Sequence, residues 1–240
     1  MKSLALVIPC KNEAKRLAVD EFLSALDACP YLMFLFVDDG STDETAEILA
    51  HLERMSPSVR ALYLPRNVGK AEAVRAGVNW LLLHTDCEAV GFWDADLATP
   101  LTELPAFVRA LDENPGCNAV LGARWPHLGV RIERSGFRRL TGSIMKFLIR
   151  LVVKVPVYDT QCGAKVFRRG TAERIFAEPF VSRWLFDIEL LKRLTPGAVR
   201  RRVREIPLNV WRDVKDSKLT FFDSLRILPD LLRISLPSHR

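Results

Sequence analysis

The sequence has 240 residues, 49% of them hydrophobic, and a formal net charge of +6. This size and apolar content support one domain with a full core, or one domain with a small appendage, and exclude an intrinsically disordered chain. The basic excess lies from residue 124 onward, which favours an anionic partner such as a phosphorylated substrate, a phospholipid surface or a nucleic acid, or else a basic surface that only faces solvent.

Cysteine, histidine and apolar patterns indicate where the protein resides. The five cysteines are odd in number and form no C-x-x-C pair, which is typical of a reducing compartment, and the four histidines lack the ligand spacing of a zinc site. The first apolar run is short and lacks a cleavage site, so we expect no signal peptide. No stretch reaches the ~20 apolar residues of a transmembrane helix. We expect a cytoplasmic protein, peripheral on the cytoplasmic face of a membrane.

Apolar runs and helix-period segments alternate through the first half of the chain. The predicted strands are residues 3–9, 33–37, 59–64, 89–93 and 119–123, and the predicted helices are 13–28, a segment containing Ile48, Leu49 and Leu52, and 70–84. Ser41 or Asp43 would cap the second helix. This alternation predicts an α/β fold with a Rossmann-like, mostly parallel and doubly wound sheet.

The pattern loosens from residue 124 onward. The expected elements are a loop over 124–134, helices over 144–155 and 184–194, an apolar run over 164–167, and a strand with Ile206, Leu208 and Val210 on one face. The segments 143–157 and 220–235 have apolar faces bordered by Lys and Arg, which suits helices in an anionic lipid interface. Amphipathic helices that face the core are the alternative.

The predicted strand 89–93 ends in two carboxylates one residue apart, Asp94 and Asp96. Alternate residues of an extended chain point the same way, so both carboxylates can address one ligand. Mg²⁺ and Mn²⁺ prefer oxygen ligands and usually share a few carboxylates with substrate phosphates, which favours a cation bound to a nucleotide diphosphate. In the alternative interpretation, Asp94 opens a loop and Asp96 caps the helix after Pro100.

Polar residues follow the first three predicted strands as well. They are Asn12-Glu13, Asp38-Asp39 and the segment Asn67-Val68-Gly69-Lys70, which opens a helix. The carboxyl ends of parallel strands share one edge of the sheet, so these groups can converge on one ligand, and a helix N-terminus with a lysine suits a phosphate. The glycine patterns of dehydrogenases and P-loop NTPases are missing, which leaves diphosphate binding through a metal.

These motifs carry a resemblance to a known family. Four motifs resemble the donor half of inverting family-2 glycosyltransferases of GT-A fold. They are Val7-Ile8-Pro9-Cys10-Lys11-Asn12-Glu13, Val37-Asp38-Asp39-Gly40-Ser41-Thr42-Asp43, Asn67-x-Gly69-Lys70 and Asp94-Ala95-Asp96. Four later motifs resemble the dolichyl-phosphate β-glucosyltransferase branch, with the mannose synthases as next relatives. They are Gly122-Ala123-Arg124, Asp159-Thr160-Gln161-Cys162-Gly163, Arg183-Trp184-x-Phe186-Asp187 and Ser217-Lys218-Leu219. The resemblance runs from about residue 3 to residue 235.

The resemblance implies a role for each matching position. The nucleotide pocket would be lined by Pro9, Asn12, Glu13, Asp38 and Asp39, with Lys70 close to the donor. Asp94 would contact the ribose or sugar and would share the metal with Asp96. Phosphate oxygens of donor or acceptor would meet Arg124, Arg134 and Arg138, and the diphosphate would be closed over by Ser217 and Lys218. Residues 1–123 would form the donor half and residues 124–240 the acceptor half of one GT-A domain.

The implied reaction is an inverting transfer of a hexose, most simply glucose from UDP-glucose, to a polyprenyl or dolichyl phosphate with Mg²⁺ or Mn²⁺. Ala98 stands where the mannose synthases tend to have glutamine, which favours the glucosyl branch. The alternatives are a GDP-mannose-dependent transferase and a sugar-nucleotide-binding, membrane-associated protein without turnover. Asp187 is the candidate base, if an anionic acceptor needs one, and structural hydrogen bonding is its alternative role.

Two further expectations concern the partners. The eukaryotic glucosyltransferases resemble membrane-anchored proteins with an N-terminal span that this sequence lacks, so attachment would come from elsewhere. Nucleic acid is not an expected partner, because binding it requires aromatic residues interleaved with basic ones on one surface. The only dense basic run is Arg200-Arg201-Arg202, which looks like a solvated strand edge.

Overall fold

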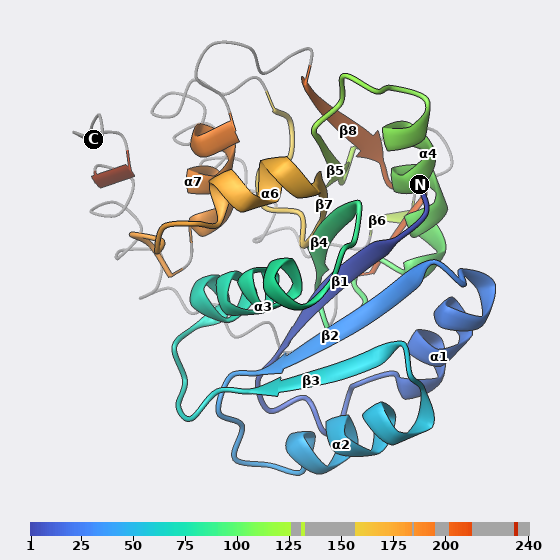
Figure 1. Cartoon of the computed structure of the whole chain (residues 1–240), viewed down its shortest axis with the longest axis vertical. Coiled ribbons are helices and arrows are strands. Elements are labelled where there is room, and N and C mark those ends of the chain that lie inside the picture. The colour runs from blue at the N-terminus through green and yellow to red at the C-terminus, as the bar shows by residue number, and fades with distance from the viewer. Residues whose placement is uncertain (126–130, 133–156, 184, 195–201, 213–232, 235–240) are drawn as a thin grey trace.

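The computed structural model describes residues 1–125, 131–132, 157–183, 185–194, 202–212 and 233–234 (Figure 1). Its strands are β1 (Leu4–Cys10), β2 (Leu32–Asp38), β3 (Val59–Tyr63), β4 (Ala89–Trp93), β5 (Ala119–Ala123), β6 (Arg131–Ile132), β7 (Ala164–Arg168), β8 (Val203–Pro207) and β9 (Val210–Trp211). Its helices are α1 (Val19–Ala28), α2 (Thr45–Met55), α3 (Lys70–His84), the 3₁₀ turn η1 (Leu101–Glu103), α4 (Leu104–Asp112), α6 (Arg169–Ile175) and α7 (Phe186–Leu194).

Seven of these strands form one sheet in the order β3-β2-β1-β4-β7-β5-β8. Neighbouring strands from β3 to β4 pair in parallel, and β5 pairs in parallel with β8. Strand β7 runs antiparallel to both of its neighbours, β4 and β5. The prediction of a mostly parallel α/β sheet is therefore confirmed, with a single reversed strand in this sheet that the alternation of runs did not reveal.

Helices cover both faces of the sheet, and each face has its own core (Figure 1). Helices α3, α6 and α7 pack on one face against side chains such as Val7 and Phe92. Helices α1, α2 and α4 pack on the other face against side chains such as Ile8 and Phe36. Because neighbouring residues of a strand point to opposite faces, a run of consecutive apolar residues is what a strand covered on both sides requires.

The first helix starts later than predicted. Residues 13–18 precede α1, and the backbone N–H groups of Arg16 and Leu17 donate to the Glu13 carbonyl in a turn. The Glu13 N–H donates to the Thr45 hydroxyl of α2, so this turn is tied to another element. This tertiary bond outweighs the local helix periodicity.

The second half differs from the prediction in two places. The strand expected through Ile206, Leu208 and Val210 is broken, because β8 ends at Pro207 and β9 starts at Val210. Within the expected loop 124–134, Arg131–Ile132 form β6, which pairs with β9 in a separate small sheet. The apolar run 164–167 lies in β7, and the helix predicted over 184–194 is α7, which starts at Phe186. Of the amphipathic segments 143–157 and 220–235, all but residues 157, 233 and 234 lie outside the described residues.

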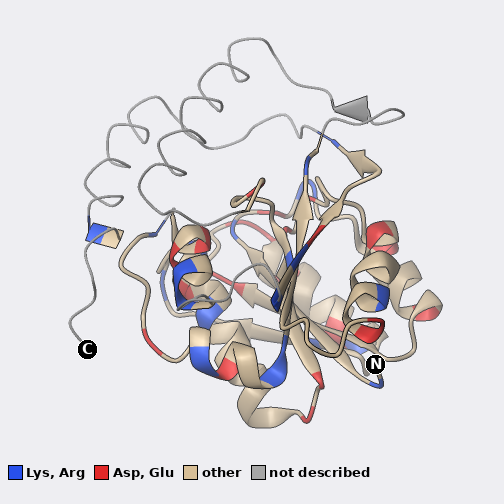
Figure 2. Ribbon diagram, turned by 90° about the horizontal axis from the view of Figure 1, so that it is seen from above, with Lys and Arg blue, Asp and Glu red and all other residues tan. Residues whose placement is uncertain are grey.

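None of the helices in the described part of the chain has the length and hydropathy that a membrane span needs. Basic and acidic segments are interspersed over this part of the chain (Figure 2). Several basic and acidic residues form ion pairs with one another, including Arg124 with Asp159 and Lys165 with Asp187.

Candidate active site

The candidate site lies at the carboxyl edge of the sheet. Parallel strands β1, β2 and β4 end there, and because β7 is antiparallel, the residues that precede it reach the same edge. Trp93 at the end of β4 pairs with Ala164 at the start of β7, and the Asp94 N–H donates to the Gly163 carbonyl at 3.0 Å. The reversed strand thus delivers the segment Asp159–Gly163 to the carboxylates of β4.

Asp94 and Asp96 occupy a tight turn. The Leu97 N–H donates to the Asp94 carbonyl at 3.2 Å, and the Ala98 N–H donates to Asp96 Oδ1 at 3.1 Å. Leu97 has a φ of 48°, in the left-handed region that non-glycine residues rarely adopt. The Trp93 indole closes the turn on the Thr99 carbonyl. Asp96 therefore caps its own turn, and the alternative in which it caps a helix after Pro100 is wrong.

Asp94 is enclosed on two sides. Lys70, the first residue of α3, donates from Nζ to Asp94 Oδ1 at 2.5 Å. On the other side, a Cβ added to Gly163 would lie 1.9 Å from Asp94 Oδ2, so only a glycine leaves room for this carboxylate. Burial opposes the charge of Lys70, but Asp94, Asp187 and Asp96 outweigh it and raise the pKa of the ammonium. Lys70 is thus held as a cation beside the carboxylate turn.

Asp96 has the chemistry of a metal ligand. Burial, and then the negative charge of Asp94, raise the pKa of Asp96. A nearby cation would therefore stabilise the ionised form of Asp96. Among the described residues, its one hydrogen bond comes from Ala98. No group of three or more His, Cys, Asp or Glu side chains in this part of the chain could hold a metal by itself. Two carboxylates fit a divalent cation that takes further oxygens from a bound phosphate.

A buried ion pair links the start of β7 to the start of α7. Lys165 on β7 is fully buried, and its ammonium donates to Asp187 Oδ1 at 2.7 Å and to the Cys162 carbonyl at 2.5 Å. Asp187 is the second residue of α7, where a negative charge also interacts favourably with the helix dipole. Of the two roles predicted for Asp187, the structure shows a structural bond.

Arg124 follows β5 and is fixed by a carboxylate. Its guanidinium donates from Nε and Nη2 to the two oxygens of Asp159 at 2.6 and 2.7 Å, and its backbone N–H donates to the same carboxylate. Asp159 is in turn fixed through its backbone N–H, which donates to Glu205 of β8. Burial lowers the pKa of Arg124, but the hydrogen bonds and the negative charge of Asp159 outweigh this effect and raise it. This arrangement orients a permanent positive charge at the sheet edge.

The predicted nucleotide-pocket residues lie at the ends of β1 and β2. Asn12, with a φ of 52°, accepts from the Thr42 N–H at 2.8 Å, which joins the two loops. Glu13 forms an ion pair with Arg16. Asp38 is buried, and its Oδ1 accepts from the Ser41 N–H. Pro9, in β1, is opposite Val37 in β2. These bonds hold the two loops side by side at the same edge.

Asp39 stabilises the turn before α3. Its carboxylate oxygens accept from the Val68 and Gly69 N–H groups at 2.6 and 2.9 Å. These bonds fix the turn from which Lys70 emerges. Gly69 has a φ of 91°, and a Cβ there would lie 2.7 Å from Arg183 Nε. The predicted contact of Asp39 with the nucleotide stays a prediction.

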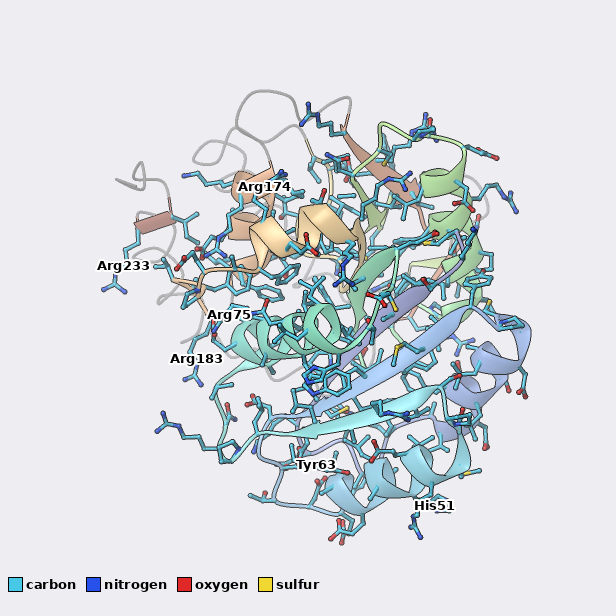
Figure 3. All side chains as sticks on the ribbon, in the orientation of Figure 1. His51, Tyr63, Arg75, Arg174, Arg183 and Arg233 are labelled. Atoms are coloured by element: carbon cyan, nitrogen blue, oxygen red, sulfur yellow. The ribbon has the colours of Figure 1, made fainter. Side chains whose placement is uncertain are left out.

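Three site residues were missed by sequence reasoning. Asp159 and Arg183 belong to motifs that carry the family resemblance, and Lys165 is an isolated charge inside the apolar run Ala164–Phe167, which was a signal for a buried partner. Arg183 extends beside the N-terminal end of α3, where its Nη2 lies 3.4 Å from Asn67 Oδ1 (Figure 3). The predicted residues Arg134, Arg138, Ser217 and Lys218 lie outside the described residues.

The sheet order and the converging carboxyl edge define a GT-A fold. The fold matches the glucosyl-3-phosphoglycerate synthase of Mycobacterium tuberculosis in complex with Mn²⁺, UDP-glucose and phosphoglyceric acid, with a TM-score of 0.73 over 99% of this chain and 82% of that one at 18% sequence identity.

The chain belongs to glycosyl transferase family 2, whose sequence model matches residues 5–176. It is 32% identical over 243 residues to a dolichyl-phosphate beta-glucosyltransferase of Trichomonas vaginalis, covering 96% of this chain and 70% of the relative. It is 34% identical over 252 residues to the dolichyl-phosphate beta-glucosyltransferase of Homo sapiens, covering 98% and 75%.

Proposed function

We propose that this chain transfers glucose from UDP-glucose to dolichyl phosphate or another polyprenyl phosphate, with inversion at the anomeric carbon. The observation that carries the proposal is the meeting of the Asp94 and Asp96 turn with Lys70 at the N-terminus of α3. Carboxylates for a divalent cation and a cation for phosphate oxygens thus share one edge of the sheet. The family and the two glucosyltransferase relatives support the choice of reaction.

The donor would lie across this edge. Asn12, Glu13 and Asp38 are placed to surround the nucleoside, and Lys70 to neutralise the diphosphate as it leaves. Asp94 and Asp96 would hold Mg²⁺ or Mn²⁺, which when bound supplies further positive charge to the leaving diphosphate. The structural neighbour in complex with Mn²⁺ and UDP-glucose has the same fold, which supports a divalent cation.

The acceptor phosphate would be the nucleophile of the reaction. A lipid phosphate is already anionic near neutral pH, so one of its oxygens can attack the anomeric carbon without a strong general base. Arg124 is placed to bind phosphate oxygens because Asp159 fixes its guanidinium, and we expect Arg134 and Arg138 to add positive charge. Asp187 would then act through Lys165 and not as a base.

Calorimetric titration with UDP-glucose, GDP-mannose and UDP-N-acetylglucosamine, each with Mn²⁺ and with chelator, tests the donor. We expect UDP-glucose to bind at least about 10-fold more tightly than GDP-mannose, since a site that hydrogen-bonds one base leaves polar groups unpaired with another. Chelation should weaken UDP-glucose binding. Radiolabelled glucose should then appear on polyprenyl phosphate. Preferred binding of GDP-mannose would assign the mannosyl reaction, and binding without transfer would indicate a protein that only binds the donor.

We also propose that the protein is peripheral on the cytoplasmic face of a membrane. The acceptor is a lipid, and the predicted amphipathic segments 143–157 and 220–235 carry basic residues beside apolar faces. In flotation with vesicles containing anionic phospholipid, the full chain should rise with the vesicles, and a chain lacking residues 220–240 should rise less. UDP-glucose binding by the shortened chain is the control for folding. Recovery of both proteins in the soluble fraction would contradict the proposal.

A further inference from the structure

The Asp94 carboxylate is held by Lys70 on one side and lies close against the backbone of Gly163 on the other, with 30% of its side chain exposed. Lys70 Nζ lies 2.5 Å from Oδ1, and Oδ2 occupies the space that a Cβ of residue 163 would fill. A cation that binds Asp94 through Oδ1 therefore has to take the place of the Lys70 ammonium. Because the ammonium is itself positive, it also repels a cation that approaches Asp96 from the same side.

The remaining carboxylate is a weak metal site by itself. Asp96 is one residue further along the turn, and its Oδ1 already accepts from the Ala98 N–H. The described residues offer no third carboxylate, histidine or cysteine that would complete a metal site with Asp94 and Asp96. A divalent cation therefore needs Asp94 as well as oxygens from another molecule.

A second anion would favour the release of Lys70 from Asp94. Its backbone is fixed at the start of α3, because Asp39 accepts from the Val68 and Gly69 N–H groups just before it. Its side chain is 39% exposed, so the ammonium can swing toward solvent on its flexible stem. The N-terminal end of α3, where the helix dipole is positive, makes the same place favourable for a phosphate.

We propose that Lys70 is an internal counter-ion which holds Asp94 until a nucleotide diphosphate draws it away, so that the divalent cation and the nucleotide bind together. The inference rests on the proposed function and extends it to the order of binding. The diphosphate gives Lys70 a new partner and gives the cation its missing oxygens. By linkage, each ligand raises the affinity for the other by the same factor.

Binding of Mn²⁺, followed by the electron paramagnetic resonance of the free ion, tests this coupling in the full chain. In the wild type, we expect saturating UDP to raise Mn²⁺ affinity by roughly 5- to 150-fold, the usual range for coupled sites. Lys70→Met should bind Mn²⁺ about 10-fold more tightly than the wild type without UDP and more weakly with UDP. The two shifts have opposite signs because Lys70 competes with the cation in one case and supports the diphosphate in the other.

Two further variants control for charge and folding. Lys2→Met removes the same charge from an exposed residue at the opposite end of β1 and should leave both affinities unchanged. Lys70→Arg keeps the charge and should retain weak binding of Mn²⁺ alone. If Lys70→Met leaves Mn²⁺ affinity unchanged, or raises it equally with and without UDP, the inference is overturned. A wild-type chain that binds neither Mn²⁺ nor UDP would overturn the proposed function as well.

Discussion

Replacing Asp96 by asparagine is expected to lower kcat for glucose transfer by about 10³-fold, because a neutral amide binds a divalent cation weakly. Stabilisation of a leaving group by a metal is worth several kcal/mol, and each ~1.4 kcal/mol is a factor of ten in rate. Steady-state kinetics in saturating Mg²⁺ and in saturating Mn²⁺ measure the effect. The loss should persist in both metals, since it arises from the charge of the ligand.

The fold should survive this substitution. An asparagine side-chain oxygen can still accept from the Ala98 N–H, which preserves the turn. Burial and the charge of Asp94 raise the pKa of Asp96, so its ionisation costs stability as pH rises through that pKa. The neutral variant should therefore be at least as stable as the wild type at pH 7 in thermal unfolding with chelator.

Asp27→Asn is the matched control for the Asp96 substitution. It removes one negative charge at an exposed position of α1 and should leave kcat unchanged. A near-normal rate for Asp96→Asn in either metal would remove Asp96 from the mechanism. A lower melting temperature with a proportional loss of active protein would instead make its role structural.

The strand positions and the convergence of their polar ends could be predicted from the sequence. Each of β1, β2 and β4 is a short apolar run that stops at polar residues, and a parallel sheet covered on both faces requires such runs. Helix α3 coincides with the predicted 70–84 because an apolar pattern and a glycine N-cap mark it locally. These features depend on neighbouring residues only.

The ion pairs of the site could not be predicted in the same way. Arg124 meets Asp159, and Lys165 meets Asp187, only because β7 enters the sheet between β4 and β5 in the reverse direction. Periodicity reports that a segment is a strand but carries no information on its direction or neighbours. The start of α1 was missed for a related reason, since the Glu13 N–H bonds to Thr45 of another helix.

The buried pair of Lys165 and Asp187 leads to the largest expected loss of stability. Asp187→Ala should lower the free energy of unfolding by about 3–5 kcal/mol, because it leaves a fully buried ammonium with the Cys162 carbonyl as its remaining hydrogen-bond partner. Urea denaturation measures the change. The control is Glu173→Ala, which breaks the exposed pair with Arg169 and should cost at most about 1 kcal/mol.

A double substitution separates the ion pair from the chemistry. Lys165→Met combined with Asp187→Leu removes both charges, and the pair of changes should be at least about 2 kcal/mol more stable than Asp187→Ala, since replacing a whole buried pair by apolar groups is often neutral. If Asp187→Ala instead keeps wild-type stability while turnover falls to a small but measurable rate, Asp187 acts in the reaction. A loss of the acidic limb of the rate–pH profile in that variant would then identify it as a general base, because protonation of a carboxylate base is what stops the reaction at low pH.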